Sequence, residues 1–300
     1  MPEKDLANTI KFFFQFEGHY FKLAIFDEAQ RMEKKDIERG LGCADITIFF
    51  YDEGQILNAE EIGTKENFIK IAKDLKIDYE LISLPVIYRV LGGEKYHNFV
   101  ENFLDNPKTA YPNIQNYEFK IFKDIEDLLK ELRNKATEKN KVALVAAFTE
   151  SPGDIYNLKS KKNKRIDKNL DIYWLMKDKK EGRSNDPNYP DFWLTDISNN
   201  LEYCASVYGC RGLEADYVGV IWGRDFLCRN EIWDLGSASI CYDTIGKPKS
   251  LKNLMESENK EERNNAFNLL KNRYRIFLTR GRKGTYIFFE DDDTYKLIQP

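Results

Sequence analysis

The sequence is poor in the residues that bind transition metals or form disulfides. It has five cysteines and two histidines among 300 residues, and no two cysteines form a CxxC pair. A zinc site or a disulfide framework is therefore not expected, and free thiols are typical of a reducing compartment. No apolar run approaches the roughly 20 residues that span a bilayer. We therefore expect a cytoplasmic protein with no membrane partner.

An excess of basic residues is also lacking. Lys and Arg number 46 against 50 Asp and Glu, which gives a net charge of −4. Any nucleic-acid contact must then come from a local patch. The best candidate is Lys159–Lys168, with aromatic neighbours at Tyr156, Tyr173, Trp174 and Trp193. Cations for phosphates and rings for bases suit a single-strand groove, but a solvated basic loop beside core aromatics is the alternative.

What is present is an alternation of strand-like and helix-like segments, which favours an α/β fold with a mostly parallel sheet. In the first part, the pattern predicts strands at Lys22–Phe26, Ile46–Tyr51 and Tyr79–Leu84, and helices at Lys34–Gly42 and Glu66–Leu75. Pro85 and the following Gly92-Gly93 pair indicate a boundary. We expect one domain over residues 1–85 and a second over 86–300.

The second part continues the alternation. The predicted elements are helices Lys95–Leu104 and Asp124–Lys139 and strands Glu118–Phe122, Val142–Phe148 and Tyr217–Trp222. Residues 151–200 are polar and indicate a loop or hairpin insertion. The segment Asn272–Phe289 predicts a helix end, a basic turn and a strand over Thr285–Phe289.

Two acidic motifs follow predicted strands of the first domain. In LAIFDEAQ, the strand delivers Asp27 and Glu28 at its carboxyl end. Such a pair suits a Mg-nucleotide site, where the first acid holds the metal through water and the second activates a water molecule. In YDEGQ, Asp52 and Gln55 lie on one turn, and the amide could contact a γ-phosphate. The alternatives are ordinary strand ends and a turn with Gly54 at positive φ.

Three motifs of the second domain present charged groups. Arg89, after LPVIY, could act on transition-state charge across a cleft, or form an inter-domain salt bridge. Gly212 permits a tight loop before a strand, and Glu214 could accept hydrogen bonds from a ribose. The TRGRK turn presents Arg280 and Arg282, whose guanidinium groups match phosphate oxygens, although a charged surface turn is the alternative.

The order of these motifs resembles that of superfamily-one helicases, and their wording resembles the Schlafen-type DNA/RNA helicase domain. The resemblance extends over about residues 20–290 and is carried by DEAQR, YDEGQ with EIGT, GLEADYVGVIWG and NRYRIFLTRGRKGTYIFF. The family usually has an aromatic residue where Ala215 stands and Gln where Arg211 stands. It implies two RecA-like domains with ATP and Mg²⁺ between them, coupled to movement along single-stranded DNA or RNA.

The resemblance also implies residue roles. Catalytic roles would fall to Glu28 as general base, Gln55 as γ-phosphate sensor, and Arg89 and Arg280 as arginine fingers. Contacts with the nucleotide would fall to Gly212, Glu214, Arg282 and Asp27, the last holding Mg²⁺ through water.

One departure from the family is the phosphate loop, because no GxxxxGK[ST] occurs in the sequence and only 26 residues precede Asp27. We therefore expect an incomplete first RecA-like domain and a chain that does not bind ATP tightly by itself. A preceding segment or a partner chain would then carry the loop. The alternative is a non-catalytic module that binds nucleic acid or protein. The open side of Leu23–Phe26 would be covered by Ile10–Phe16 or by a partner.

Overall fold

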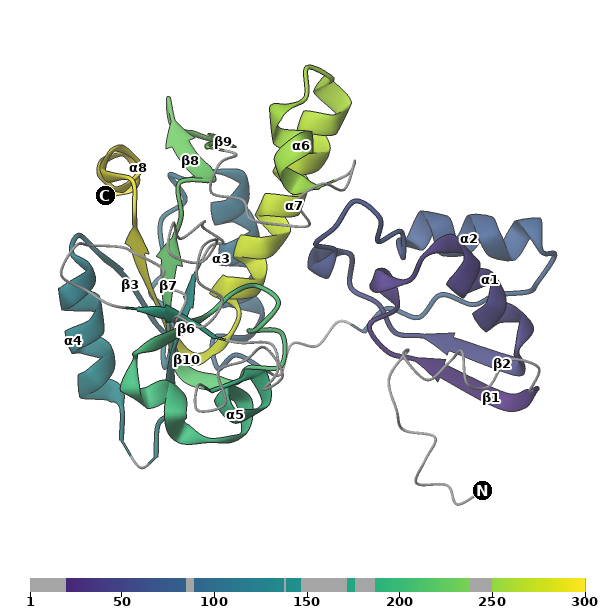
Figure 1. Cartoon of the computed structure of the whole chain (residues 1–300), viewed down its shortest axis with the longest axis horizontal. Helices are drawn as coiled ribbons and strands as arrows, with labels where there is room; N and C mark the ends of the chain where they lie inside the picture. The colour runs from purple at the N-terminus through teal and green to yellow at the C-terminus, as the bar shows by residue number, and fades with distance from the viewer. Residues whose placement is uncertain are drawn as a thin grey trace, which may run out of the picture. The chain divides into compact units, whose positions relative to one another are not determined.

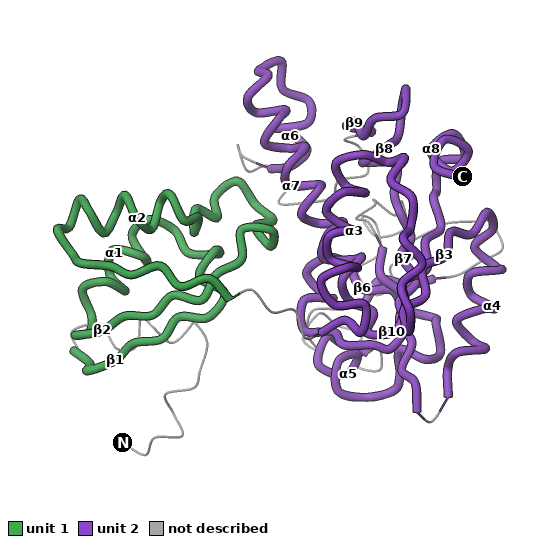
Figure 2. Tube along the Cα trace, turned by 180° about the vertical axis from the view of Figure 1, so that it is seen from behind, with its two compact units in different colours: residues 1–84 green, residues 85–300 purple. Residues whose placement is uncertain are grey.

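The computed structural model describes residues 20–84, 89–137, 139–146, 172–175, 187–237 and 250–299 (Figure 1). The chain divides into two compact units, unit 1 over Met1–Leu84 and unit 2 over Pro85–Pro300 (Figure 2). Both units are α/β. The segment Ile10–Phe16 and the basic patch Lys159–Lys168 lie outside the described residues.

Unit 1 is built on two parallel strands, β1 (Phe21–Phe26) and β2 (Ala44–Phe49). Parallel neighbours need a crossover, and α1 (Lys34–Gly42) supplies it, while α2 (Lys65–Asp74) packs beside α1. The strands are in register, with Phe26 opposite Phe49. Their carboxyl ends, where both acidic motifs begin, are therefore adjacent.

The helices of unit 1 cover one face of this small sheet. There Phe49 stacks on Phe26 at 5.2 Å between ring centroids and approaches Phe68 at 5.0 Å. On the other face, four aliphatic side chains are 38–60% exposed: Leu23, Ile25, Ile46 and Ile48. We call this the open face. Within the described part of the chain, β1 pairs only with β2.

The prediction of a strand at Tyr79–Leu84 is wrong. These six residues form no strand, and Tyr79, Ile82 and Leu84 are exposed. An apolar run becomes a strand only where a neighbour satisfies its backbone N–H and C=O groups, and none pairs with this one.

Unit 2 contains a six-stranded sheet in which all strands are parallel, as expected. The order is β3 (Glu118–Phe122), β10 (Gly281–Phe289), β7 (Ala215–Trp222), β4 (Val142–Ala146), β6 (Tyr203–Ala205) and β5 (Tyr173–Trp174). β4 is buried along its length, as is typical of a central strand covered on both faces.

Helices cover both faces of this sheet. One face is covered by α4 (Ile125–Lys135), and the other by α3 (Gly93–Asp105) and α7 (Lys260–Leu278) (Figures 1 and 2). Gly219 of β7 lets α4 approach, because a Cβ there would lie 2.7 Å from Leu132 and 2.8 Å from Leu128. The remaining elements are α5 (Tyr189–Leu194), α6 (Leu251–Glu256), α8 (Asp292–Ile298) and the hairpin of β8 (Phe226–Arg229) and β9 (Ile232–Leu235).

Within the segment 151–200, the structure describes only residues 172–175 and 187–200. There β5 pairs in parallel with β6, and α5 follows. Trp174 is buried in the core of unit 2. The rest of the segment lies outside the described residues.

Removal of the Leu132 side chain should destabilise unit 2. The residue is fully buried between α4 and the sheet, so Leu132→Ala should lower the free energy of unfolding by about 2–5 kcal/mol. Leu194→Ala is the control, because Leu194 is 83% exposed; it should change stability by less than about 0.5 kcal/mol. Equal effects in denaturant titrations would contradict the assigned packing.

Candidate functional site

The carboxyl ends of β1 and β2 form an acidic edge, defined here by Asp27, Glu28, Gln30, Asp52 and Gln55. The backbone turns at Glu28, which is left-handed with φ 55° and ψ 36°. This conformation costs a non-glycine residue on the order of 1 kcal/mol, and such strain is often found at functional positions. The turn is held to the next strand, because the N–H of Ala29 donates to the carbonyl of Phe50 at 2.8 Å.

A buried amide links the two acidic motifs. Gln30 is 1% exposed. Its Nε2 donates to Glu28 Oε2 at 2.9 Å, and its Oε1 accepts the N–H of Asp52 at 3.3 Å. The carboxylate of Asp52 in turn accepts Gln55 Nε2 at 2.9 Å. Sequence reasoning assigned Gln30 no role, although its place two residues after the acid pair is a usable signal.

Asp27 is the exposed member of the pair, and its Oδ1 accepts the N–H of Glu28 at 2.8 Å. Over the described ranges, no group of three or more His, Cys, Asp or Glu side chains could hold a metal ion. Mg²⁺ is often bound by one carboxylate together with waters and substrate phosphates. The residues present therefore fit a water-mediated Mg²⁺ site, and they do not fit an all-protein cage.

The EIGT motif (Glu61–Thr64) packs against the backbone of the acidic edge. Its Gly63 approaches the turn so closely that a Cβ would lie 2.2 Å from the carbonyl oxygen of Ala29, and its N–H donates to the carbonyl of Gln30 at 3.2 Å. Thr64 then caps α2, since its Oγ1 accepts the N–H of Asn67 at 3.3 Å. The motif thus shapes the acidic edge and starts the helix that packs beside it.

Unit 2 gathers its motif residues at the amino ends of β7 and β10. We call this region the arginine edge and define it by Arg89, Gly212, Glu214 and Arg280. Arg280 follows α7 and is 3% exposed, so the surface-turn alternative does not describe it. Its Nη1 donates to the carbonyl of Arg211 at 2.9 Å, and its Nε donates to that of Ile276 at 3.2 Å. The TRGRK turn is thereby joined to the loop that holds Gly212.

Arg89 and Glu214 also meet at this edge. Arg89 Nε lies 3.8 Å from Glu214 Oε1, with the two side chains 42% and 63% exposed. The pair lies within unit 2. Because an exposed ion pair contributes little stability, both groups can exchange it for a ligand at small cost.

Gly212 and Arg282 have structural neighbours that explain their positions. A Cβ on Gly212 would lie 2.9 Å from the Trp193 ring, so the loop packs directly on the indole. The Arg282 side chain is exposed, and its carbonyl accepts the N–H of Leu91 at 2.8 Å. The segment after Arg89 is therefore bonded to the start of β10, which contains Arg282.

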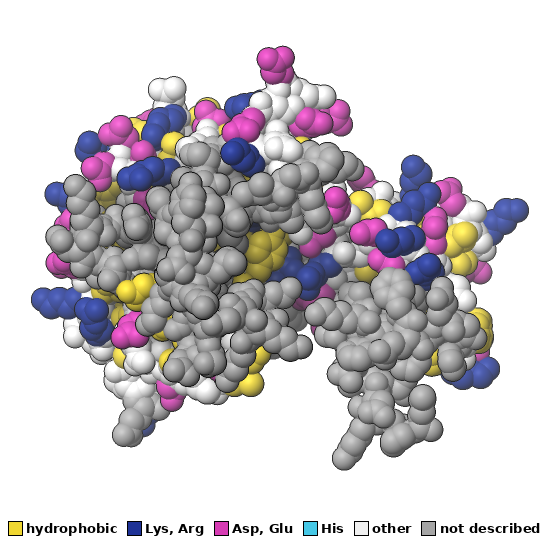
Figure 3. Space-filling view, in the orientation of Figure 1, with side chains coloured by type: hydrophobic (Ala, Val, Ile, Leu, Met, Phe, Trp, Pro, Cys, Tyr) yellow, Lys and Arg dark blue, Asp and Glu magenta, His cyan; other side chains and the backbone are white. Residues whose placement is uncertain are grey.

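Two of the aromatic residues predicted to stack on bases, Trp174 and Trp193, have other partners, whereas Tyr156 lies outside the described residues. Trp174 belongs to the core, and Trp193 packs on Gly212 and donates its Nε1–H to the carbonyl of Gly209 at 2.6 Å. These contacts favour the core alternative for Trp174, and they assign the half-buried Trp193 ring a structural partner. On the face seen in Figure 3, cationic and anionic side chains of the described residues are interspersed.

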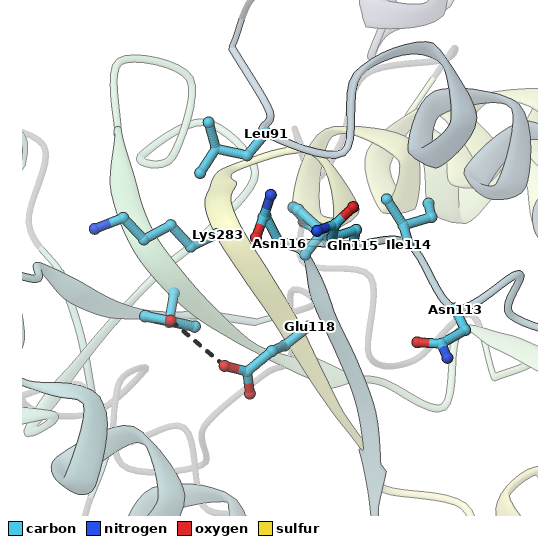
Figure 4. A pocket seen from close by; sticks show the side chains of 9 residues that line it. Leu91, Asn113, Ile114, Gln115, Asn116, Glu118 and Lys283 are labelled. Carbon is cyan, nitrogen blue, oxygen red and sulfur yellow. Dashed lines mark hydrogen bonds between the residues drawn. The ribbon is translucent and has the colours of Figure 1, made fainter.

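A pocket of about 570 Å³ opens beside the arginine edge (Figure 4). It is lined by Leu91, Asn113, Ile114, Gln115, Asn116, Tyr117, Glu118, Tyr217 and Lys283. The positive charge of Lys283, which lines the pocket, is paired with a carboxylate. Its Nζ lies 3.0 Å from Asp216 Oδ1 and also donates to Asn140 Oδ1 at 2.7 Å. The Tyr217 hydroxyl donates to Glu118 at 3.4 Å, the bond drawn in Figure 4.

Glu118 has a strongly perturbed acidity. Burial acts to raise its pKa, but hydrogen bonds from Lys135, Tyr286 and Lys120 outweigh it and hold the pKa at about 2. The Tyr286 hydroxyl donates at 2.8 Å, and Lys120 Nζ lies 3.1 Å away. The carboxylate thus ties the start of β3 to α4 and β10.

An all-parallel sheet covered by helices makes this an α/β protein, and the architecture fits the RecA-like class. A family model described as the Schlafen group 3 DNA/RNA helicase domain matches residues 3–291. The chain belongs to this family. Membership supports a helicase-related function, with nucleic acid as partner and nucleotide binding as a family theme.

No curated protein matches the chain significantly. None of the helices in the described part of the chain is long and apolar enough to cross a membrane.

Gln30→Met should loosen the acidic edge. The substitution keeps the volume but removes both hydrogen bonds, so unit 1 should lose about 1–3 kcal/mol of stability. Amide hydrogen exchange of β1 and β2 measures this loss. Gln115→Met, at an exposed amide of unit 2, is the control and should leave those amides unchanged. Unchanged exchange in Gln30→Met would contradict the bridging role.

The stability of unit 2 should fall in acid partly through Glu118. Its pKa of about 2 in the folded chain lies below the usual value of about 4.3. The stabilisation is therefore present above about pH 4.3 and is lost as the pH falls towards 2. Glu118→Gln should be less stable than the parent at pH 6, and the difference should shrink by pH 2.5. A constant difference across urea titrations from pH 6 to 2.5 would refute the depressed pKa.

Proposed function

We propose that the chain is motor machinery of a helicase or translocase that couples nucleotide hydrolysis to movement along single-stranded DNA or RNA. The observation that carries the proposal is the pairwise joining of the motifs. Gln30 joins the acid pair to the Asp52 motif, and Arg280 joins the TRGRK turn to the Gly212 loop. A motor needs its motifs to be coupled, and these hydrogen bonds are the physical connections through which that coupling would act.

The acidic edge would bind Mg²⁺ and activate the attacking water. Asp27 would hold Mg²⁺ through water, and Mg²⁺ when bound would neutralise charge on the phosphates. Glu28, whose carboxylate is oriented by Gln30, would accept a proton from the attacking water. Gln55 would contact the γ-phosphate.

The arginine edge would stabilise the negative charge of the nucleotide phosphates. Arg89 and Arg280 would stabilise the phosphoryl group in the transition state, and Arg282 would contact phosphate. Arg89 is half-exposed and the more accessible finger, whereas Arg280 would act from a buried position. Glu214 would contact the ribose, and Gly212 would permit the tight loop of the nucleotide site that precedes it.

ATP turnover by this chain alone is expected to be negligible. The sequence contains no GxxxxGK[ST] phosphate loop. The backbone amides and the lysine of such a loop make most of the contacts that bind the phosphates. We propose that the loop comes from further sequence or from a partner polypeptide.

A non-catalytic binding module is the second candidate, and the open face favours it. Leu23, Ile25, Ile46 and Ile48 are exposed together on one side of the β1–β2 sheet. Clustered aliphatic side chains on a surface are typical of docking sites. A polypeptide that docks there would also complete unit 1, so this observation is compatible with the partner that the motor requires.

ATP hydrolysis should stay at background when the purified chain is assayed with Mg²⁺ and single-stranded DNA or RNA. The same oligonucleotides should bind in a salt-dependent manner, measured by fluorescence anisotropy. Absence of binding to both nucleic acids would refute the motor and leave a module that binds protein.

Robust turnover would refute the need for an external loop. In that case Glu28→Gln should abolish it, by at least about 100-fold, and Glu126→Gln, at an exposed acid of α4, should not.

A further inference from the structure

Three buried hydroxyl groups surround the turn that carries Arg280. Tyr96 of α3 donates to the carbonyl of Leu278 at 2.8 Å, and Thr285 Oγ1 donates to the same oxygen at 3.1 Å. The hydroxyl of Tyr117, just before β3, donates to the carbonyl of Gly281 at 3.2 Å and lies 2.8 Å from Thr285 Oγ1. We call Tyr96, Tyr117 and Thr285 the hydroxyl clamp.

The clamp is well suited to hold carbonyl groups. All three side chains are buried, and the two tyrosine rings pack at 3.9 Å between centroids. Burial raises the pKa of Tyr96 and of Tyr117, so both hydroxyls keep their protons and remain donors. The bonds lie inside the protein, where water does not compete for them.

The carbonyls held by the clamp flank Arg280 on both sides. Leu278 is the last residue of α7, so its carbonyl has no acceptor role within the helix. Gly281 begins β10 at an irregular register, and a Cβ there would lie 2.1 Å from the carbonyl oxygen of Gly284. The path of the backbone between helix and strand is therefore set by side chains from α3, β10 and the loop before β3.

We propose that Tyr96 and Tyr117 are positioning residues for Arg280. They fix the backbone on either side of the arginine, and the guanidinium then reaches the carbonyls of Arg211 and Ile276. The inference rests on the proposed function in one respect, because the position of Arg280 affects catalysis only if Arg280 contacts a nucleotide. The opposing interpretation is that these hydroxyls contribute only to the general stability of unit 2.

The test is the solvent exchange of the Arg280 Nε–H, measured by NMR on the full chain. This proton is buried and bonded to Ile276, so its exchange is slow while the turn is held. In Tyr96→Phe/Tyr117→Phe, which retains both rings, exchange should be faster by about 10-fold or more, equivalent to about 1.4 kcal/mol. Each single variant should show a smaller increase.

Two references separate positioning from general stability. Tyr286→Phe removes a hydroxyl on β10 that bonds Glu118 instead, and it should leave the exchange of Arg280 unchanged. The Nε–H of Arg275 is bonded to Glu101 of α3, so it reports on the packing of α7 against α3 and should not change in the clamp variants. Equal acceleration of Arg280 in Tyr286→Phe, or of Arg275 in the clamp variants, would overturn the proposal.

The measurement needs no nucleotide or nucleic acid. Failure of the clamp therefore shows in the exchange rates, whereas failure of the motor shows in the ATP and oligonucleotide assays. A turn that stays rigid in the double variant refutes the clamp even if the motor is confirmed.

Discussion

Parallel strand pairing is the constraint on which both candidate edges depend. Parallel neighbours place their like ends at the same edge of a sheet, so motifs separated in sequence meet wherever their strands are adjacent. In unit 1 this brings the turn after β1 beside the Asp52 motif, because Phe26 lies opposite Phe49 and Gln30 bonds the N–H of Asp52. In unit 2, β10 lies beside β7, which brings the TRGRK turn beside the loop of Gly212.

Buried polar side chains then connect what the sheets bring together. Gln30 and Arg280 are both almost fully buried, and each bonds to the backbone of a neighbouring motif. A buried polar group is costly unless it is satisfied, so these positions tolerate few other arrangements. The hydroxyls of Tyr96 and Tyr117 extend the same principle from side chains to the carbonyls around Arg280. Asp27 and Arg89, two of the charged groups proposed to meet a ligand, are exposed.

Much of the fold was predictable from periodicity. The strands at β1, β3 and β7 and the helices at α1 and α4 follow from apolar runs and acidic helix starts, and β3 was predicted to the residue. The prediction of a strand at Tyr79–Leu84 failed for a physical reason, because no described strand pairs with this segment. The β5–β6 pairing could not be predicted, since a two-residue strand has no periodicity to detect.

The types and order of the motif residues can be read directly from the chain, and they suffice to recognise the helicase family. The surroundings of these residues follow from the three-dimensional fold. The fold buries Arg280, for which the sequence left a charged surface turn as the alternative, and it pairs Arg89 with Glu214 inside one unit. It also gave Gln30 and Tyr117 their partners, which lie 22 and more than 160 positions away in the chain. Long-range contacts of this kind arise from the order of strands in the sheet, and local sequence patterns do not predict that order.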